Sequence, residues 1–158
     1  MNVDSEETFA LSSPVVPTTR AGASRLGSAY WREVERSTLG TVRVRGTAVS
    51  LELRVLGRGP VLLRFGVAQV EVGPTGVSCT YPILGGLLAR GAGGELAFDH
   101  QRASGWQLRL AIRGFSPRLV GRRGSPSWTG LVYSQVQARL HRAIGRRYIA
   151  RLARESRP

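Results

Sequence analysis

The sequence contains no lysine, and all 23 of its basic side chains are arginines. Against ten acidic residues they give a formal net charge of +13 and an isoelectric point near 11.6. Because the planar guanidinium group suits phosphate and carboxylate recognition, this balance favours an anionic partner. The chain is also poor in asparagine, methionine and isoleucine, and rich in residues that GC-rich codons encode. Codon usage would explain the arginine excess without any function, so both interpretations stay open.

Cysteine and histidine are scarce too, which excludes several kinds of site. The single cysteine, Cys79, rules out an internal disulfide and a cysteine-built metal site, and we expect it in the core. With two histidines and no carboxylate cluster, we expect no metal and no other cofactor. Asp99 and His100 are neighbours on a predicted strand and point to opposite faces, so they cannot form a catalytic relay. His141 is expected at the surface, and no catalytic residue is predicted.

Long hydrophobic runs are absent, since none approaches the roughly 20 residues that span a bilayer. Asp4, Glu6 and Glu7 stand where a secretory signal would carry basic residues. We therefore expect a soluble cytoplasmic protein. Residues 1–22 are polar and rich in proline, serine and threonine, which is typical of a disordered tail, and residues 23–158 are expected to form a single domain.

Between residue 41 and about residue 114, apolar residues recur with a period of two. The clearest run is 106–113, and similar runs lie at 49–55, 61–65, 68–72, 77–81 and 96–98. The phase slips by one residue at Gly66-Val67, which indicates a bulge or a bend. Short turns separate the runs, so we predict an antiparallel meander with one apolar and one exposed face. Many arginines fall on the exposed face, where acids could pair with them: Arg43, Arg45, Arg54, Arg64, Arg109 and Arg113.

Helices are predicted on both sides of these strands. Residues 24–37 predict a short helix with Ser28 as N-cap, and no strand is expected before it. A long helix from about Thr129 to Glu155 carries an apolar arc that would cover the sheet. After Gly145, arginines return to that arc, so the helix must there pass the edge of the sheet, bend, or face a wet cavity or partner. The fold class is therefore α+β: a single curved antiparallel β-sheet packed against a long C-terminal α-helix, with a short N-terminal helix.

This order of elements is similar to the helix-grip architecture of START-like domains, the superfamily that includes polyketide cyclases and plant pollen-allergen lipid carriers. The resemblance covers residues 24–155 and rests on organisation, because the sequence holds no diagnostic motif. Those domains begin with a strand and two short helices, which this sequence does not predict. The resemblance implies a groove for a small apolar or amphipathic ligand between sheet and final helix, lined by Cys79, Tyr81, Phe98, Trp106, Leu108, Leu110, Tyr133, Val136 and Leu140. The alternative is that these side chains form a packed core.

Two arginine clusters carry a second hypothesis. They are candidate anion-binding residues and comprise Arg118, Arg122 and Arg123 in a loop and Arg147, Arg151 and Arg154 in the last helix. They would suit nucleic acid or an anionic membrane surface. The glycine-rich run 85–94 lacks the Lys-Ser/Thr end of a phosphate-binding loop and is interpreted as a flexible loop or a lid. Three hypotheses follow: a non-catalytic ligand-binding domain, an arginine-rich module on an anionic partner, and a cavity enzyme such as a cyclase.

Overall fold

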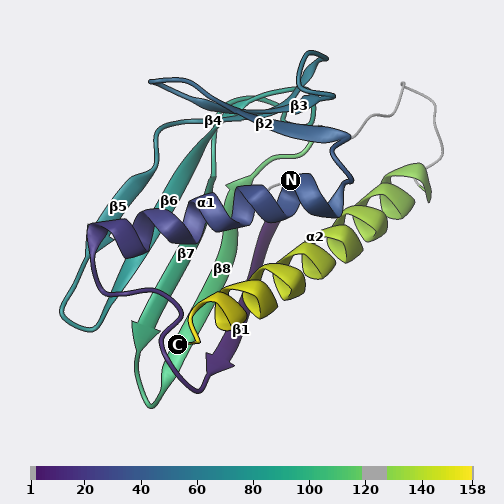
Figure 1. Ribbon diagram of the computed structural model, residues 1–158. Coiled ribbons are helices and arrows are strands. Elements are labelled where there is room, and N and C mark those ends of the chain that lie inside the picture. The colour runs from purple at the N-terminus through teal and green to yellow at the C-terminus, as the bar shows by residue number, and fades with distance from the viewer. Residues whose placement is uncertain (1–2, 119–127, 158) are drawn as a thin grey trace.

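The computed structural model describes residues 3–118 and 128–157, with their side chains except those of residue 3 and residues 128–138. It has the helices α1 (Arg20–Ser37) and α2 (Trp128–Glu155). The strands are β1 (Val3–Leu11), β2 (Val42–Gly46), β3 (Leu51–Val55), β4 (Val61–Phe65), β5 (Gln69–Val72), β6 (Gly76–Gly85), β7 (Glu95–Arg102) and β8 (Trp106–Phe115). All of them join one antiparallel sheet in the order β1-β8-β7-β6-β4-β3-β2, with β5 paired to β6. The predicted fold class, a curved antiparallel sheet with a long C-terminal helix, is confirmed (Figure 1).

The bend predicted at Gly66-Val67 separates β4 from β5, which both pair with β6. Phe65 pairs with Ile83, whereas Gln69 pairs with Thr80 farther back along β6. A Cβ atom at position 66 would lie 2.7 Å from Cγ of Pro82, so glycine is the residue that fits this close approach. The break lets β2 and β3 arch away from β6–β8, and this curl creates the concave side of the sheet (Figure 1).

Strand β1 corrects the expectation of a disordered tail and of no strand before the helix. It pairs along its length with β8, with Glu7 opposite Leu110 and Leu11 opposite Trp106. Its inward positions include Ser5 and Glu7, so the strand carries little apolar periodicity of its own. Pairing with a strand about a hundred residues away supplies the backbone hydrogen bonds that hold it.

Helix α1 is also longer than predicted. It begins at Arg20, and the N-cap is Thr19, whose side chain accepts a hydrogen bond from the N–H of Gly22 (3.0 Å). The predicted cap, Ser28, lies inside the helix, where its hydroxyl donates to the carbonyl of Arg25. Gly22 and Gly27 weaken the helical signal of the first turns, because glycine is a poor helix former.

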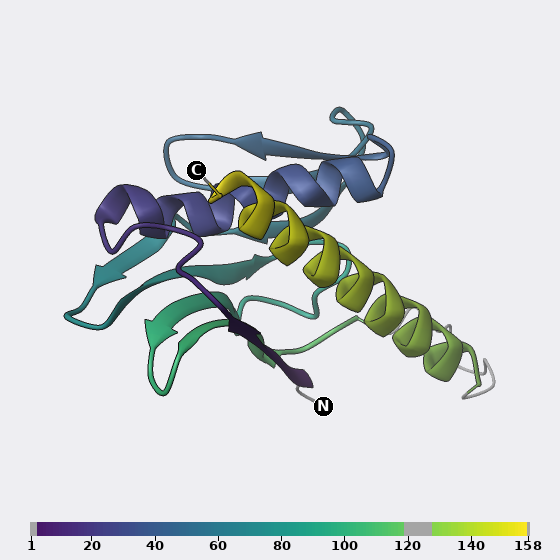
Figure 2. The same ribbon diagram turned by 60° about the horizontal axis from the view of Figure 1, so that its bottom comes forward.

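Both helices lie on the concave side of the sheet (Figure 2). Helix α2 crosses it diagonally, with its C-terminal half against α1 and with buried side chains at Ile144, Tyr148 and Leu152. At the other end of α1, Glu35 accepts a hydrogen bond from the N–H of Val44 in β2 (2.8 Å), which ties the edge of the sheet to the helix.

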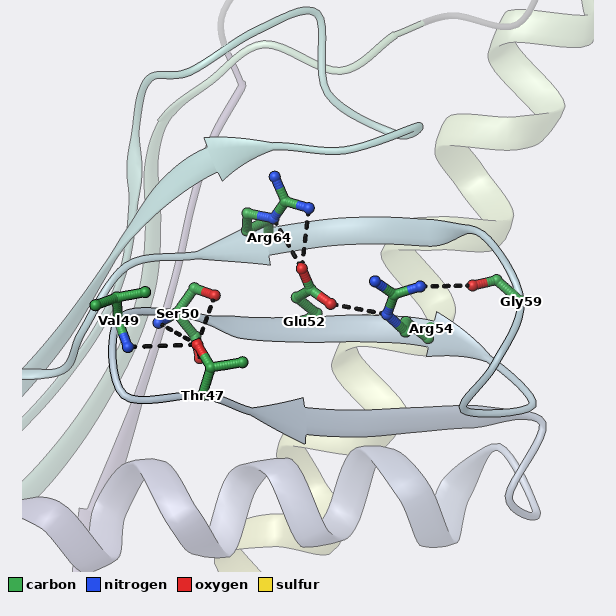
Figure 3. A network of polar contacts seen from close by, with 7 residues as sticks. All are labelled: Thr47, Val49, Ser50, Glu52, Arg54, Gly59 and Arg64. Carbon is green, nitrogen blue, oxygen red and sulfur yellow. Dashed lines mark hydrogen bonds and ion pairs between the residues drawn. The ribbon is translucent and has the colours of Figure 1, made fainter.

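The convex side carries ion pairs for four of the six strand arginines that the sequence places there: Arg54, Arg64, Arg109 and Arg113. Arg43 and Arg45 of β2 form none with the described residues. Glu52 of β3 accepts hydrogen bonds from Arg54 (2.7 Å) and Arg64 (3.0 Å), and Arg54 also donates to the carbonyl of Gly59 (Figure 3). The bond from Arg54, together with that from Arg64, holds the pKa of Glu52 below its usual value. Farther along the sheet, Arg109 pairs with Asp99 at 3.0 Å. Ordinary surface pairing therefore accounts for these four strand arginines.

Candidate ligand-binding cavity

A cavity of about 240 Å³ lies between the two helices and the curled end of the sheet. Its lining comes from the C-terminal half of α1, from α2, from β2–β4 and from the ends of β6–β8: Tyr30, Trp31, Val34, Thr38, Val42, Leu53, Leu62, Leu63, Phe65, Ile83, Leu88, Leu96, Ile112, Phe115, Leu140, His141 and Ile144. The curl of the sheet forms this space, because it moves β2–β4 away from the plane of the other strands. Leu140 is 47% exposed, which places it where the cavity meets solvent.

Few polar side chains interrupt this apolar lining. Nδ1 of His141 lies 3.3 Å from the hydroxyl of Tyr30, and Thr38 contributes a further hydroxyl. Burial lowers the pKa of His141, although the nearby Glu7 opposes the shift, and burial raises the pKa of Tyr30. Both groups are therefore neutral near pH 7. The expectation that His141 is a surface residue is wrong, because α2 turns it toward α1.

Trp31 also lines the cavity, and its Nε1 atom is buried without a hydrogen-bond partner in the described part of the chain. Its ring packs against Phe65, with a centroid distance of 4.9 Å, and against Tyr81 at 5.3 Å. A buried indole N–H usually has an acceptor, so this unpaired group is destabilising. Because the Nε1 atom is fully buried, Trp31 lines the cavity with carbon atoms of its ring and not with its N–H.

The structure separates the sequence-predicted lining residues into several groups. Leu140 lines the cavity. Trp106 lies elsewhere and packs on the ring of His100, with a centroid distance of 4.9 Å. The side chains of Tyr133 and Val136 lie outside the described residues. The others belong to the packed core beside the cavity: Cys79, Tyr81, Phe98, Leu108 and Leu110.

Most of the actual lining could not be predicted from the sequence. Leu53, Leu63 and Phe65 were identified as inward strand residues, yet nothing in their pattern distinguishes cavity wall from core. Val34 and Thr38 come from α1, which the groove hypothesis left out. The available signal was the phase slip at Gly66-Val67, because a bend there moves β4 and its neighbours out of the plane.

The remaining candidate groups have structural roles. His100 is 1% exposed, accepts a hydrogen bond from the N–H of Val15 at Nε2 (3.2 Å) and donates from Nδ1 to the carbonyl of Gln107 (3.0 Å). These contacts fix the neutral tautomer, and burial lowers the pKa of this histidine. Burial likewise raises the pKa of the Cys79 thiol. No group of three or more potential metal ligands occurs among the described residues.

The predicted arginine clusters also differ in their surroundings. Arg118 is exposed, whereas Arg122 and Arg123 lie outside the described residues. Arg147, Arg151 and Arg154 line an open groove of about 340 Å³ between α1 and α2, together with Glu33, Arg36 and Ala150. We call this the arginine groove. It lies away from the sheet, so the return of arginines to the helical arc after Gly145 places them in a wet groove, outside the core.

Comparisons with known proteins establish the fold. No model of a known protein family matches the chain, and no curated protein is similar to it. Among solved structures, the Zhui aromatase/cyclase from Streptomyces sp. R1128 is similar with a TM-score of 0.55 at 13% identity, covering 99% of this chain and 97% of that one. Ara h 8.0201 gives a TM-score of 0.43 at 12% identity, covering 94% and 98%. The first likeness shows a helix-grip fold, in which the single helix α1 stands where the sequence resemblance implies two short ones. Neither described helix is apolar enough over its length to cross a membrane.

Proposed function

We propose that the protein binds a compact apolar or amphipathic small molecule in the cavity between α1, α2 and the curled sheet, without transforming it. The main support for this proposal is the cavity itself, which has a volume of about 240 Å³ and is lined mostly by aliphatic and aromatic side chains. An engineered apolar cavity of about 150 Å³ stays dry and binds benzene. A space of this size therefore suits a molecule of one or two rings or a short branched chain.

The polar groups of the cavity support an amphipathic ligand. The Tyr30–His141 pair offers a donor and an acceptor at neutral pH. A ligand with one hydroxyl or carbonyl group would satisfy these atoms while its apolar body fills the remainder. No carboxylate, cysteine or serine is among the described lining residues, so binding is favoured over nucleophilic chemistry by those groups.

The test is binding of 2-naphthol, a probe with two fused rings and one hydroxyl. We expect saturable binding with a change in the emission of Trp31, and native mass spectrometry of freshly purified protein should show a copurifying small molecule. Leu140→Trp should weaken binding by narrowing the cavity mouth. Leu84→Trp is the matched control, because Leu84 is similarly exposed, at 43%, but does not line the cavity. Equal binding by both variants, or no binding by the wild type, would overturn the proposal.

A further inference from the structure

The arginine groove is the second built recess of the molecule, on the side of the helices away from the cavity. Arg36 of α1 faces it from one side, and Arg147, Arg151 and Arg154 of α2 from the other. With four guanidinium groups and one carboxylate, Glu33, its lining carries a net charge of +3. Such a concave basic surface attracts anions strongly.

A buried carboxylate organises the groove. The side chain of Glu33 is 4% exposed, accepts a hydrogen bond from Nε of Arg151 (3.0 Å) and another from the hydroxyl of Ser37 (3.2 Å). Because Nε of Arg151 is committed to Glu33, the guanidinium plane is fixed while its two terminal amino groups stay available as donors. Nε of Arg154 donates to the carbonyl of Ala150 (3.3 Å), which orients that side chain in the same way.

The remaining arginines of the groove have no paired acid within it. Glu155 shares a small adjoining recess with Arg36, but its carboxylate pairs with Arg25 at 3.0 Å. All ten acidic side chains of the chain fall within the described ranges, and Glu33 is the one that lines the groove. Arg36 and Arg147 form no ion pair with the described residues, whereas the strand arginines Arg54 and Arg109 do. Arg43 and Arg45 of β2 are also without an ion pair to the described residues, but they lie outside the groove. Codon usage would explain how many arginines the chain has, but it gives no reason for several to converge without partners.

We propose that the arginine groove binds the diphosphate group of a small molecule. Two neighbouring phosphates match the excess of about three positive charges, and guanidinium forks bind phosphate oxygens in pairs. Among the residues that the structure describes, no aromatic side chain lines the groove, so recognition concerns the phosphates rather than a stacked base. The exposed large apolar residues of the described chain, such as Leu39 and Leu56, lie outside the groove, which disfavours insertion into a lipid surface.

The test is isothermal titration with inorganic pyrophosphate at near-physiological salt. We expect saturable binding to one site, weaker binding of inorganic phosphate, and a loss of about tenfold or more, equivalent to about 1.4 kcal/mol, in Arg36→Gln/Arg147→Gln. Both side chains are exposed, and replacing them leaves the Arg151–Glu33 pair intact. This variant should therefore fold, and circular dichroism will check that it does. Arg36→Lys/Arg147→Lys should bind between the two, because lysine keeps the charge but loses the fork.

The matched control is Arg43→Gln/Arg45→Gln, which removes the same charge from two exposed residues of β2 outside the groove. We expect it to bind pyrophosphate nearly as well as the wild type. Equal losses in both glutamine variants would mean that net charge alone attracts the anion, and the proposal would fall. It would also fall if the wild type failed to bind pyrophosphate, or if it bound a short DNA duplex or phosphatidylserine vesicles more tightly. None of these residues lines the cavity. A loss of pyrophosphate binding can therefore be distinguished from a loss of naphthol binding.

Discussion

The hydroxyl of Tyr148 donates a 2.8 Å hydrogen bond to the main-chain carbonyl of Leu26, which joins α2 to α1 in the buried layer between the helices. Both residues are almost fully buried, and the Tyr148 ring packs edge-on against Tyr30 at 5.5 Å. The contact joins the two helices whose side chains line both the cavity and the arginine groove.

Tyr148→Phe removes this hydrogen bond and keeps the ring. We expect a loss of about 1 kcal/mol in the free energy of unfolding, because the Leu26 carbonyl loses a buried partner. Urea denaturation measures it, and Ser28→Ala, at an exposed position of α1, should change the free energy by much less. An unchanged midpoint in Tyr148→Phe would show that the hydrogen bond contributes nothing to holding the helices together.

Two helical glycines should respond to alanine in opposite directions. At Gly27, a methyl group would overlap the hydroxyl of Tyr81, so Gly27→Ala should destabilise the protein by about 1–3 kcal/mol. At Gly145, the nearest atoms to a methyl group would be Oε2 of Glu7 at 3.4 Å and Cδ2 of Leu110 at 3.6 Å, which leaves room. Gly145→Ala should therefore stabilise α2 by up to about 1 kcal/mol through helix propensity. Thermal melts of the two variants test this, and the same sign of shift in both would contradict it.

The buried His100 and the half-buried His141 should make stability depend on pH. Burial lowers the pKa of both His100 and His141 below the value of about 6.5 that each has in the unfolded chain. The unfolded state then takes up protons first as pH falls, so the stabilisation is complete above about pH 6.5 and is lost progressively below it. Urea denaturation at several pH values measures the slope. His100→Gln should reduce the slope, and a slope unchanged in that variant would mean that His100 is not held neutral.

The pair Glu33–Arg151 should show strong coupling in a double-mutant cycle. Arg151→Met leaves the Glu33 carboxylate buried without its cationic partner, and Arg151 is only partly exposed, so we expect a loss of about 1–3 kcal/mol in the free energy of unfolding. Adding Glu33→Leu removes the unpaired charge and should recover much of that loss. Additive effects in the cycle would show that the pair does not act as a unit.

Local sequence patterns predicted the strands from β3 to β8 and the long helix α2. Alternation of apolar and polar residues sets which face of a strand is buried, and this local signal is strong in 106–113 and adequate in the shorter runs. The bend at Gly66-Val67 could also be predicted from this pattern. A slip of one residue in the alternation would move the following side chains to the other face unless the backbone bends or bulges there. The assignment of Asp99 and His100 to opposite faces follows from strand geometry alone.

Strand β1, the full length of α1 and the location of the cavity depend on tertiary contacts and could not be predicted from local sequence. β1 has polar residues at some inward positions, so its own sequence does not indicate a strand. It forms because it pairs along its length with β8, which lies about a hundred residues away in the sequence. The cavity depends on how far the sheet curls, so Leu63 became cavity wall while Phe98, with the same alternation, became core.

The arginine groove combines both contributions. The sequence placed Arg147, Arg151 and Arg154 on one stripe of α2, since helical spacing fixes which residues share a face. Only the packing of α2 against α1 brought Arg36 and the buried Glu33 beside them. Periodicity acts over a few neighbouring residues and fixes which side chains lie on the same face of an element. The distance between two elements is set by the side chains buried between them, which come from distant parts of the sequence.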